Sequence, residues 1–354
     1  MFGIYRFILA LNVMLFHILQ LPTIGPLAVY SFFILSGFLM TTILHNSYGY
    51  TRSGFKKYAI NRFLRLYPTY WFLLLLIIFI IFLVGAEFAK ESHSKMQMPT
   101  TITEWTANIG MLFIQFNPVE YSPRLAPPTW ALTIELFFYT LIGLGVSKTK
   151  KITWIWFAAS ASYIVLTNLI TGKLGTGYGN IFNASLPFSI GSLLFFYRIK
   201  LLALIKKTPH CGKILTSIFL FNVCLTSVIS AFSFEFFQQH GWKVEIISTW
   251  LNLPLSALMT VLLFSIRPHS KRLKELDLKL GDYSYPLYIF HTGAACLASW
   301  IFVQIGLLSK EEYILPIFIL ALIISLCACQ LSESLVNNKI NKLRNKIKAG
   351  TNVN

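Results

Sequence analysis

An arginine and a histidine stand inside the first apolar stretch of the chain, GIYRFILALNVMLFHILQL at residues 3–21. Arg6 and His17 are eleven positions apart, which on an α-helix places them roughly 16 Å apart along the axis and close to one face. An ionisable group inside a membrane span costs about 2.5 kcal/mol or more, so such residues usually serve a site. A histidine there can act as a general base or as a nucleophile. The alternative for Arg6 is the positive start of an export signal, but no small-residue cleavage site follows it.

A single carboxylate lies well inside a later apolar stretch, Glu135 in TWALTIELFFY at residues 129–139. If this stretch runs opposite to the first, Glu135 lies about six residues, roughly 9 Å, from the surface that His17 also approaches. We therefore expect Glu135 to orient His17, to hold one tautomer of its ring, or to bind a hydroxylated substrate. A hydrogen bond between two helices without catalytic duty is the alternative.

Two arginines, Arg62 and Arg65, stand three positions apart in YAINRFLRLYPTYW at residues 58–71. This spacing places them on one face of a predicted helix that ends near Pro68. Guanidinium groups on one face suit phosphate, whereas a polybasic membrane anchor is the commoner meaning of such a segment. His17 favours the phosphate-binding interpretation of the two arginines. A phosphate site about one phosphopantetheine arm away from a base indicates a bound coenzyme A thioester threaded into the bilayer.

A polar strip is predicted on a late apolar segment, LGDYSYPLYIFH at residues 280–291. Ser284, Tyr288 and His291 recur at helical spacing and so share one face, which could line a tunnel for the pantetheine arm. The competing interpretation makes the serine and tyrosine interface anchors and makes His291 a packing residue with satisfied hydrogen bonds.

The elements that must position these residues are membrane-spanning helices. The 354 residues are 55% hydrophobic, 16% aromatic and only 12% charged, and their mean hydropathy is +0.64. This composition predicts an all-α, multi-pass membrane protein whose partner is the lipid bilayer. The net charge of +17 could suggest nucleic acid. In a membrane protein, however, basic residues mostly set topology and attract anionic headgroups, so we expect no nucleic-acid partner.

Ten spans are predicted, with both termini cytoplasmic. Lysine and arginine concentrate in alternate connecting segments at every step, as the positive-inside rule requires. We divide the chain into an integral membrane domain at 1–335 and a basic cytoplasmic tail at 336–354. The spans are expected near residues 5–21, 24–45, 66–86, 129–146, 152–170, 179–198, 213–233, 244–266, 283–306 and 312–333.

The longest outside connection, residues 87–128, contains TEWTANIGMLFIQF, which is too short to span and suits a re-entrant or interfacial helix that could cover a site. A zinc set of His17, Glu135 and His291 is conceivable. Three ligands on three helices without local ligand spacing argue against it, so we expect no metal.

The chain resembles the acyltransferase 3 family of integral membrane acyltransferases, which includes O-antigen and other surface-glycan O-acetylases. The resemblance covers nearly the whole chain, and Glu333 matches a late acidic position of the family. The matching stretches are Arg6 with His17, SFFILSGFL (31–39), RFLRLYP (62–68), TWALTIELFFY (129–139) and LGDYSYPLYIFH (280–291).

The resemblance implies about ten spans, a cytoplasmic acyl-CoA donor and a glycan acceptor that is commonly presented outside. By position, the resemblance assigns the family's arginine and histidine roles to Arg6 and His17. It assigns the family's basic segment to Arg62 and Arg65 and its acidic position to Glu135. Two positions depart from the family pattern and affect the acceptor side. Tyr30 stands where an acidic residue is common, and Ala131 stands where a serine is usual.

These observations predict an inner-membrane O-acyltransferase that moves an acetyl group from acetyl-CoA to a hydroxyl of a surface polysaccharide or a lipid-linked sugar precursor. His17 and Glu135 are the predicted catalytic residues, with His17 as general base in direct transfer or as nucleophile through an acyl-histidine. The predicted donor-binding residues are Arg6, Arg62, Arg65, Ser284, Tyr288 and His291. The alternative is a glycan or acyl-group exporter with a buried proton relay. The oligomeric state is left open.

Overall fold

The computed structural model describes residues 1–21, 24–171, 178–207, 210–232, 234–266, 268, 270–307 and 312–349, and their side chains outside 226–249 and 345–349. This part of the chain is all-helical and contains no strand, which confirms the predicted fold class. The last five residues of the predicted basic tail, 350–354, lie outside the described residues.

Each predicted span coincides with a helix. The long helices are α1 (Phe2–Leu19), α2 (Ile24–Ile43), α3 (Arg52–Val84), α6 (Trp130–Leu141), α7 (Lys150–Thr171), α8 (Ile181–Lys207), α9 (Cys211–Phe232), α10 (Phe234–Ser265), α11 (Lys271–Gln304) and α12 (Ile314–Ser332). Among the described residues, eight helical segments are long and apolar enough to cross a membrane, and the chain is a multi-pass membrane protein. The described apolar parts of α9 and α10 are shorter, so the count of ten and the side of the termini stay predictions.

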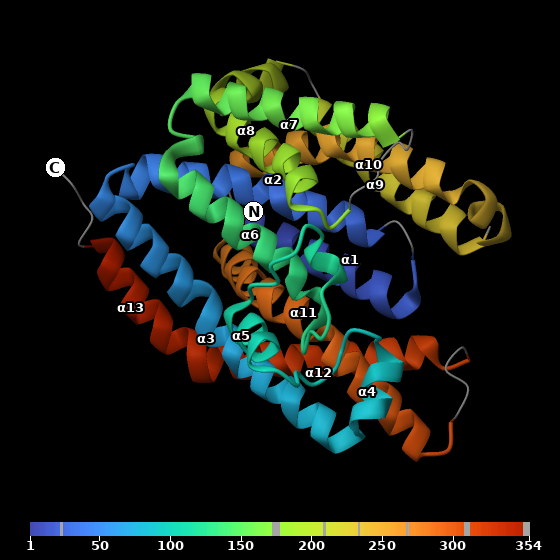
Figure 1. Ribbon diagram of the computed structural model, residues 1–354. Helices are drawn as coiled ribbons and strands as arrows, with labels where there is room; N and C mark the ends of the chain where they lie inside the picture. Colours follow the sequence, from blue (N-terminus) through green and yellow to red (C-terminus); the bar gives the residue numbers. More distant parts are fainter. Residues whose placement is uncertain are drawn as a thin grey trace.

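The helices form two groups on either side of a central set (Figure 1). Helices α7 to α10 gather on one side of α2, and α3, α12 and the C-terminal helix α13 (Asn338–Ala349) lie on the other. Between them α1 packs mainly against α11 and also against α2, while α2 packs against α8. The predicted site residues of α1, α6 and α11 therefore come from the middle of the bundle.

The crossing of α1 and α11 is close because glycines meet there. A Cβ atom on Gly281 would lie 2.9 Å from the Cα of Gly3, nearer than side chains tolerate. The backbone N–H of Ile4 also donates to Oδ1 of Asp277 at 2.9 Å, so a carboxylate of α11 satisfies one of the unpaired donors that begin a helix. These contacts fix the level of α1 along α11 and thus the height of its arginine and histidine.

Helix α3 does not end near Pro68, contrary to the prediction from sequence. It runs without a break from Arg52 to Val84 with the proline inside. Proline removes one backbone hydrogen bond, but packed neighbours can supply others to a helix within a membrane. The proline leaves the carbonyl of Leu64 without its N–H donor, and in the same helical turn the hydroxyl of Tyr285 on α11 donates to the carbonyl oxygen of Leu66 at 3.0 Å.

The segment 86–128 closes one end of the bundle, which we call the loop end. It contains two short helices, α4 (Ala86–Ser92) and α5 (Ile102–Gly110). Aromatic residues of α3 hold the last carbonyls of α5. Tyr67 donates to Gly110 at 2.8 Å, Trp71 donates to Ile109 at 3.0 Å, and Tyr70 donates to Asn108. The predicted short helix therefore exists and is fixed to α3, while its position in the membrane stays a prediction.

Candidate active site

A cavity with an empty volume of about 390 Å³, counted to its open side, lies among α1, α2, α6 and α11. Apolar and aromatic side chains form most of its wall and a few polar groups reach into it, a lining that is typical of sites for small molecules. It brings together four of the residues predicted from sequence. The lining residues are Arg6, Val29, Phe32, Phe33, Ala131, Leu132, Glu135, Ser284, Tyr285 and Tyr288.

Glu135 is held by hydroxyl groups and not by a histidine. Its Oε1 accepts a hydrogen bond from Ser36 on α2 at 2.8 Å, and its Oε2 accepts one from Tyr139, one turn along α6, at 2.9 Å. Among the described residues no hydrogen bond joins Glu135 to His17. The structure therefore offers no support for an orienting role, and it leaves Glu135 as a carboxylate facing the cavity. Each oxygen keeps a second lone pair for a ligand.

Arg6 faces the same cavity from α1. Its guanidinium makes no hydrogen bond or ion pair with any residue that the structure describes. Glu135 lines this cavity together with Arg6. Arg6 thus presents donors that a phosphate, a carboxylate or a carbonyl oxygen of a bound molecule could accept.

The polar strip of α11 is present, and its members differ in what they contact. Ser284 donates to the carbonyl of Gly281 in its own helix at 2.8 Å, which suits a packing role. Tyr288 donates to the carbonyl of Pro128 in the loop end at 3.0 Å, so its ring stands across the cavity toward that end. The ring of Phe32 lies 5.9 Å from that of Tyr288 between centroids, and the two form an aromatic boundary.

Three histidines gather at the loop end, and we call His17, His93 and His291 the histidine cluster. The ring centroid of His17 lies 5.2 Å from that of His291 and 5.9 Å from that of His93. The ring of His291 in turn lies 6.4 Å from that of Tyr288. His17 and His291 therefore adjoin the cavity across the tyrosine and do not line it.

His291 is fully buried and keeps an unused nitrogen. Its Nδ1 lies 3.2 Å from the carbonyl oxygen of Leu287. A carbonyl oxygen only accepts, so in the neutral ring Nδ1 carries the proton and Nε2 bears the lone pair. Nε2 is buried and has no hydrogen-bond partner. This nitrogen is therefore available to a proton of a neighbouring ring or of a ligand.

Reasoning from sequence missed two residues of the loop end. His93 caps the end of α4, and its Nδ1 lies 3.2 Å from the backbone N–H of Lys95, which donates to it. Arg124 is only 3% exposed and donates to the carbonyl of Pro118 at 3.0 Å. Burial lowers the pKa of Arg124 to about 10, so it still carries a positive charge at neutral pH. The sequence signal that could have revealed these residues is a histidine and an arginine within the long connection that is expected to cover the site.

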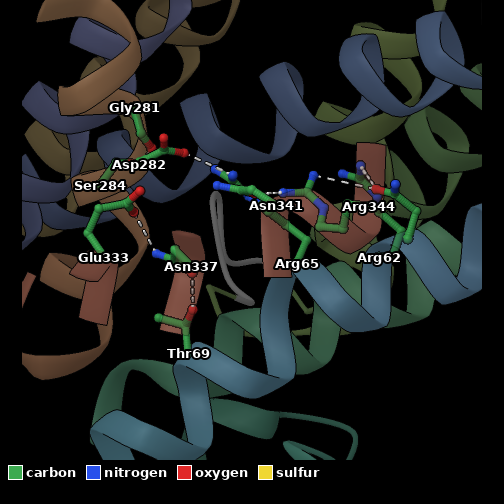
Figure 2. Close-up of polar contacts among 11 residues, drawn as sticks. Arg62, Arg65, Thr69, Gly281, Asp282, Ser284, Glu333, Asn337, Asn341 and Arg344 are labelled. Atoms are coloured by element: carbon green, nitrogen blue, oxygen red, sulfur yellow. Dashed lines mark hydrogen bonds and ion pairs between the residues drawn. The ribbon is translucent and has the colours of Figure 1, made fainter. Parts of the chain in front are cut away.

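The predicted arginine pair lies at the other end of α1. Figure 2 shows Arg62 and Arg65 on α3, with the guanidinium group of Arg65 directed toward Asp282 and Arg62 beside Arg344. Arg65 pairs with Asp282 of α11 at 3.0 Å, which partly neutralises it. Arg62 donates to Oδ1 of Asn61 at 3.0 Å and contacts the sulfur of Met40 at 3.7 Å. Sequence reasoning also missed Arg344 of α13, which it assigned to a tail.

The sites have a linear order. Arginines lie at one end, Arg6 and Glu135 face a central cavity, and Tyr288 separates this cavity from the histidine cluster. Such an arrangement can hold an elongated, phosphate-bearing molecule with a reactive group at one end.

The fold and these residues define a multi-pass helical membrane protein with a cavity between two clusters of ionisable residues. The model of the acyltransferase 3 family, described as an acyltransferase domain, matches residues 3–333. The chain belongs to this family of membrane acyltransferases, and this confirms the resemblance seen in its motifs. No curated protein and no solved structure matches the chain.

Proposed function

We propose that this membrane acyltransferase moves an acetyl group from acetyl-CoA, bound from the cytoplasmic side of the inner membrane, to a hydroxyl group of an acceptor. The acceptor is a surface polysaccharide or its lipid-linked precursor. The observation that carries the proposal is the cavity itself, because Arg6 lines it on one side and Tyr288, whose ring adjoins that of His291, lines it on the other.

The donor is held along its length. Arg62 and Arg65 bind phosphates of the coenzyme, and Arg6 binds at the mouth of the cavity, where its guanidinium has no partner among the described residues. The pantetheine arm follows the apolar walls past Ser284 and Tyr288. Arg6 and His17 are roughly 16 Å apart along the helix axis, which accommodates this extended arm.

The chemistry takes place beside His17. A ring nitrogen of His17 removes the proton from the acceptor hydroxyl, whose oxygen attacks the thioester carbonyl carbon. The carbon–sulfur bond then breaks, and the coenzyme A thiolate leaves and takes the proton from the imidazolium. His291 lies against His17 and supplies an unprotonated nitrogen that can hold it in orientation. An acyl-histidine on His17 would use the same placement in two steps.

Glu135 acts inside the cavity and not on His17 in this scheme. Ser36 and Tyr139 hold its carboxylate in one orientation, and its remaining lone pairs can accept amide N–H groups of the pantetheine arm or an acceptor hydroxyl. Its charge also balances that of Arg6.

The assay that tests the proposal uses the purified full chain in lipid nanodiscs. Free coenzyme A should appear from acetyl-CoA only when a hydroxylated glycan acceptor is present, one thiol for each acetyl group gained by the acceptor. Mass spectrometry of the surface glycan from cells with and without the gene should show the matching loss of acetyl mass. Transport of glycan or acetyl groups without any thiol release would replace this proposal with the exporter alternative.

A further inference from the structure

Arg344 of α13 lies beside Arg62 of α3, although 282 positions separate them in the sequence (Figure 2). An Nη atom of Arg62 lies 3.0 Å from Oδ1 of Asn61, and an Nη atom of Arg344 lies 3.5 Å from the same oxygen. Two guanidinium groups therefore converge on one neutral amide. Like charges repel, and the repulsion is stronger where water is partly excluded, so this arrangement calls for an anion.

Unused hydrogen-bond donors surround this point. Nε of Arg62, Nε of Arg344 and Nδ2 of Asn61 are buried and have no direct hydrogen-bond partner within the described part of the chain, and Asn61 is 0% exposed. The hydroxyl of Tyr48 is also buried, and it lies close to the side chain of Asn61 and to both arginines. Leaving buried donors unpaired is costly. A group with several acceptor oxygens, such as a phosphate, can accept hydrogen bonds from both guanidinium groups at once.

The nearby carboxylate is already engaged. Asp282 pairs with Arg65 at 3.0 Å, and within the described part of the chain no other carboxylate pairs with Arg62, Arg65 or Arg344. Among the described residues, Arg62 and Arg344 therefore have no carboxylate in direct contact. Their positive charge is what a phosphate dianion or diester would neutralise.

Helix α13 is held in place independently of any ligand. Asn337, at its start, accepts a hydrogen bond from Thr69 of α3 at 2.6 Å and donates to Glu333 at 2.9 Å (Figure 2). Within α13, Asn341 accepts from Arg344 at 2.7 Å and so orients its guanidinium. The C-terminal helix thus presents Arg344 toward α3 from a fixed position.

We propose that Tyr48, Asn61, Arg62 and Arg344 form a phosphate-binding site, one side of which is supplied by the C-terminal helix α13. This inference rests on the proposed function, since the phosphate it binds there belongs to the coenzyme A donor. The same chemistry would accept the phosphate of an anionic phospholipid headgroup, and the experiment separates these two sources. The segment described from sequence as a basic tail becomes part of the donor site.

Arg344→Gln tests the site, with Lys342→Gln as the matched control because it removes one positive charge from an exposed position of the same helix. The full chain is purified in nanodiscs of zwitterionic phosphatidylcholine, and the Kd of coenzyme A is measured by calorimetry. Arg344→Gln should raise this Kd roughly ten-fold or more, whereas Lys342→Gln should change it by less than about two-fold. Arg344→Lys should fall between them, because it keeps the charge and loses the forked donors.

Each outcome decides a different point. If the wild-type chain binds coenzyme A and Arg344→Gln binds it equally well, this inference is wrong and the proposed function stands. If the wild-type chain does not bind coenzyme A, the proposed donor is wrong. The phosphate site then stands only if phosphatidylglycerol raises the Tm of the wild-type chain and not that of Arg344→Gln. Should Arg344→Gln fail to fold, Arg344→Lys carries the comparison, with an expected rise in Kd of about three-fold.

Discussion

The three imidazole rings of the histidine cluster differ in what their nitrogens contact. His291 uses Nδ1 on the carbonyl of Leu287, and His93 uses Nδ1 on the N–H of Lys95. His17 makes no hydrogen bond with any residue that the structure describes. Two rings are therefore fixed by the backbone, and the ring of His17 remains available to a substrate. This difference supports His17 as the reacting group and makes its neighbours positioning residues.

Replacing His17 tests the centre of the proposed mechanism. His17→Ala should lower the rate of acetyl transfer at least roughly 100-fold, because the acceptor hydroxyl loses its base. The Kd of coenzyme A should stay near the wild-type value, since the arginines lie at the other end of α1. His45→Ala is the matched control, because His45 is a partly buried histidine that packs on Phe195 and contacts Ser147 instead. Near wild-type transfer by a folded His17→Ala protein would contradict the mechanism.

Glu135 can be separated from His17 by a double-mutant cycle. Because Glu135 contacts Ser36 and Tyr139 and faces the cavity, Glu135→Gln should weaken acetyl-CoA binding by about three- to ten-fold. The same factor should appear in the His17→Ala background, since residues without shared partners contribute independently. The measurement is the Kd of acetyl-CoA for the four proteins. Unchanged binding together with a kcat loss that disappears when His17 is absent would restore the orienting role predicted from sequence.

At the scale of the elements, the position of the site depends on how closely α1 approaches α11. Gly281→Ala would place a methyl group 2.9 Å from the Cα of Gly3, which is closer than two non-bonded carbon atoms normally approach. Overpacking of this kind costs about 1–3 kcal/mol, so the Tm of the purified protein should fall by several degrees. Transfer should fall as well, because Arg6 and His17 move with α1.

Gly110→Ala is the control for this substitution. Its added methyl group would meet only a leucine side chain at 3.5 Å, an ordinary contact, so its Tm should match that of the wild-type chain. Equal Tm values for Gly281→Ala and Gly110→Ala would show that the glycine contact does not set the position of α1.

The sequence predicted the helices far better than it predicted the contacts of the loop end. Periodicity reveals which residues share a face, and it correctly placed Ser284 and Tyr288 together. It cannot reveal which segment folds back onto which helix. His93 reaches His17 and Arg344 reaches Arg62 through contacts between segments far apart in the chain, and no local spacing encodes these. Pro68 was misread because a neighbouring helix supports the backbone there.

At the scale of the whole molecule, the donor and acceptor sides follow from the orientation of the bundle. The arginines and α13 lie toward one end of α1, and segment 86–128 with the histidine cluster lies toward the other. Donor and acceptor can then approach from opposite faces of the membrane and meet inside the bundle. The fold alone does not distinguish the two faces, and the distribution of basic residues supplies the expected direction.

Cysteine labelling in intact cells tests this direction. Lys90, in α4 of the loop end, and Lys150, at the start of α7, are both exposed, and they are expected on opposite sides of the membrane. A cysteine at Lys90 should react with an impermeant thiol reagent in intact cells. A cysteine at Lys150 should react only after the cells are opened, because the basic segment before α7 is expected on the cytoplasmic side. The unsubstituted chain measures the background of the native cysteines, of which Cys224 and Cys327 are exposed on the bundle surface. If Lys150→Cys reacts in intact cells and Lys90→Cys does not, the bundle has the opposite orientation in the membrane. Coenzyme A would then have to reach Arg62 and Arg344 from outside, where cells do not supply it.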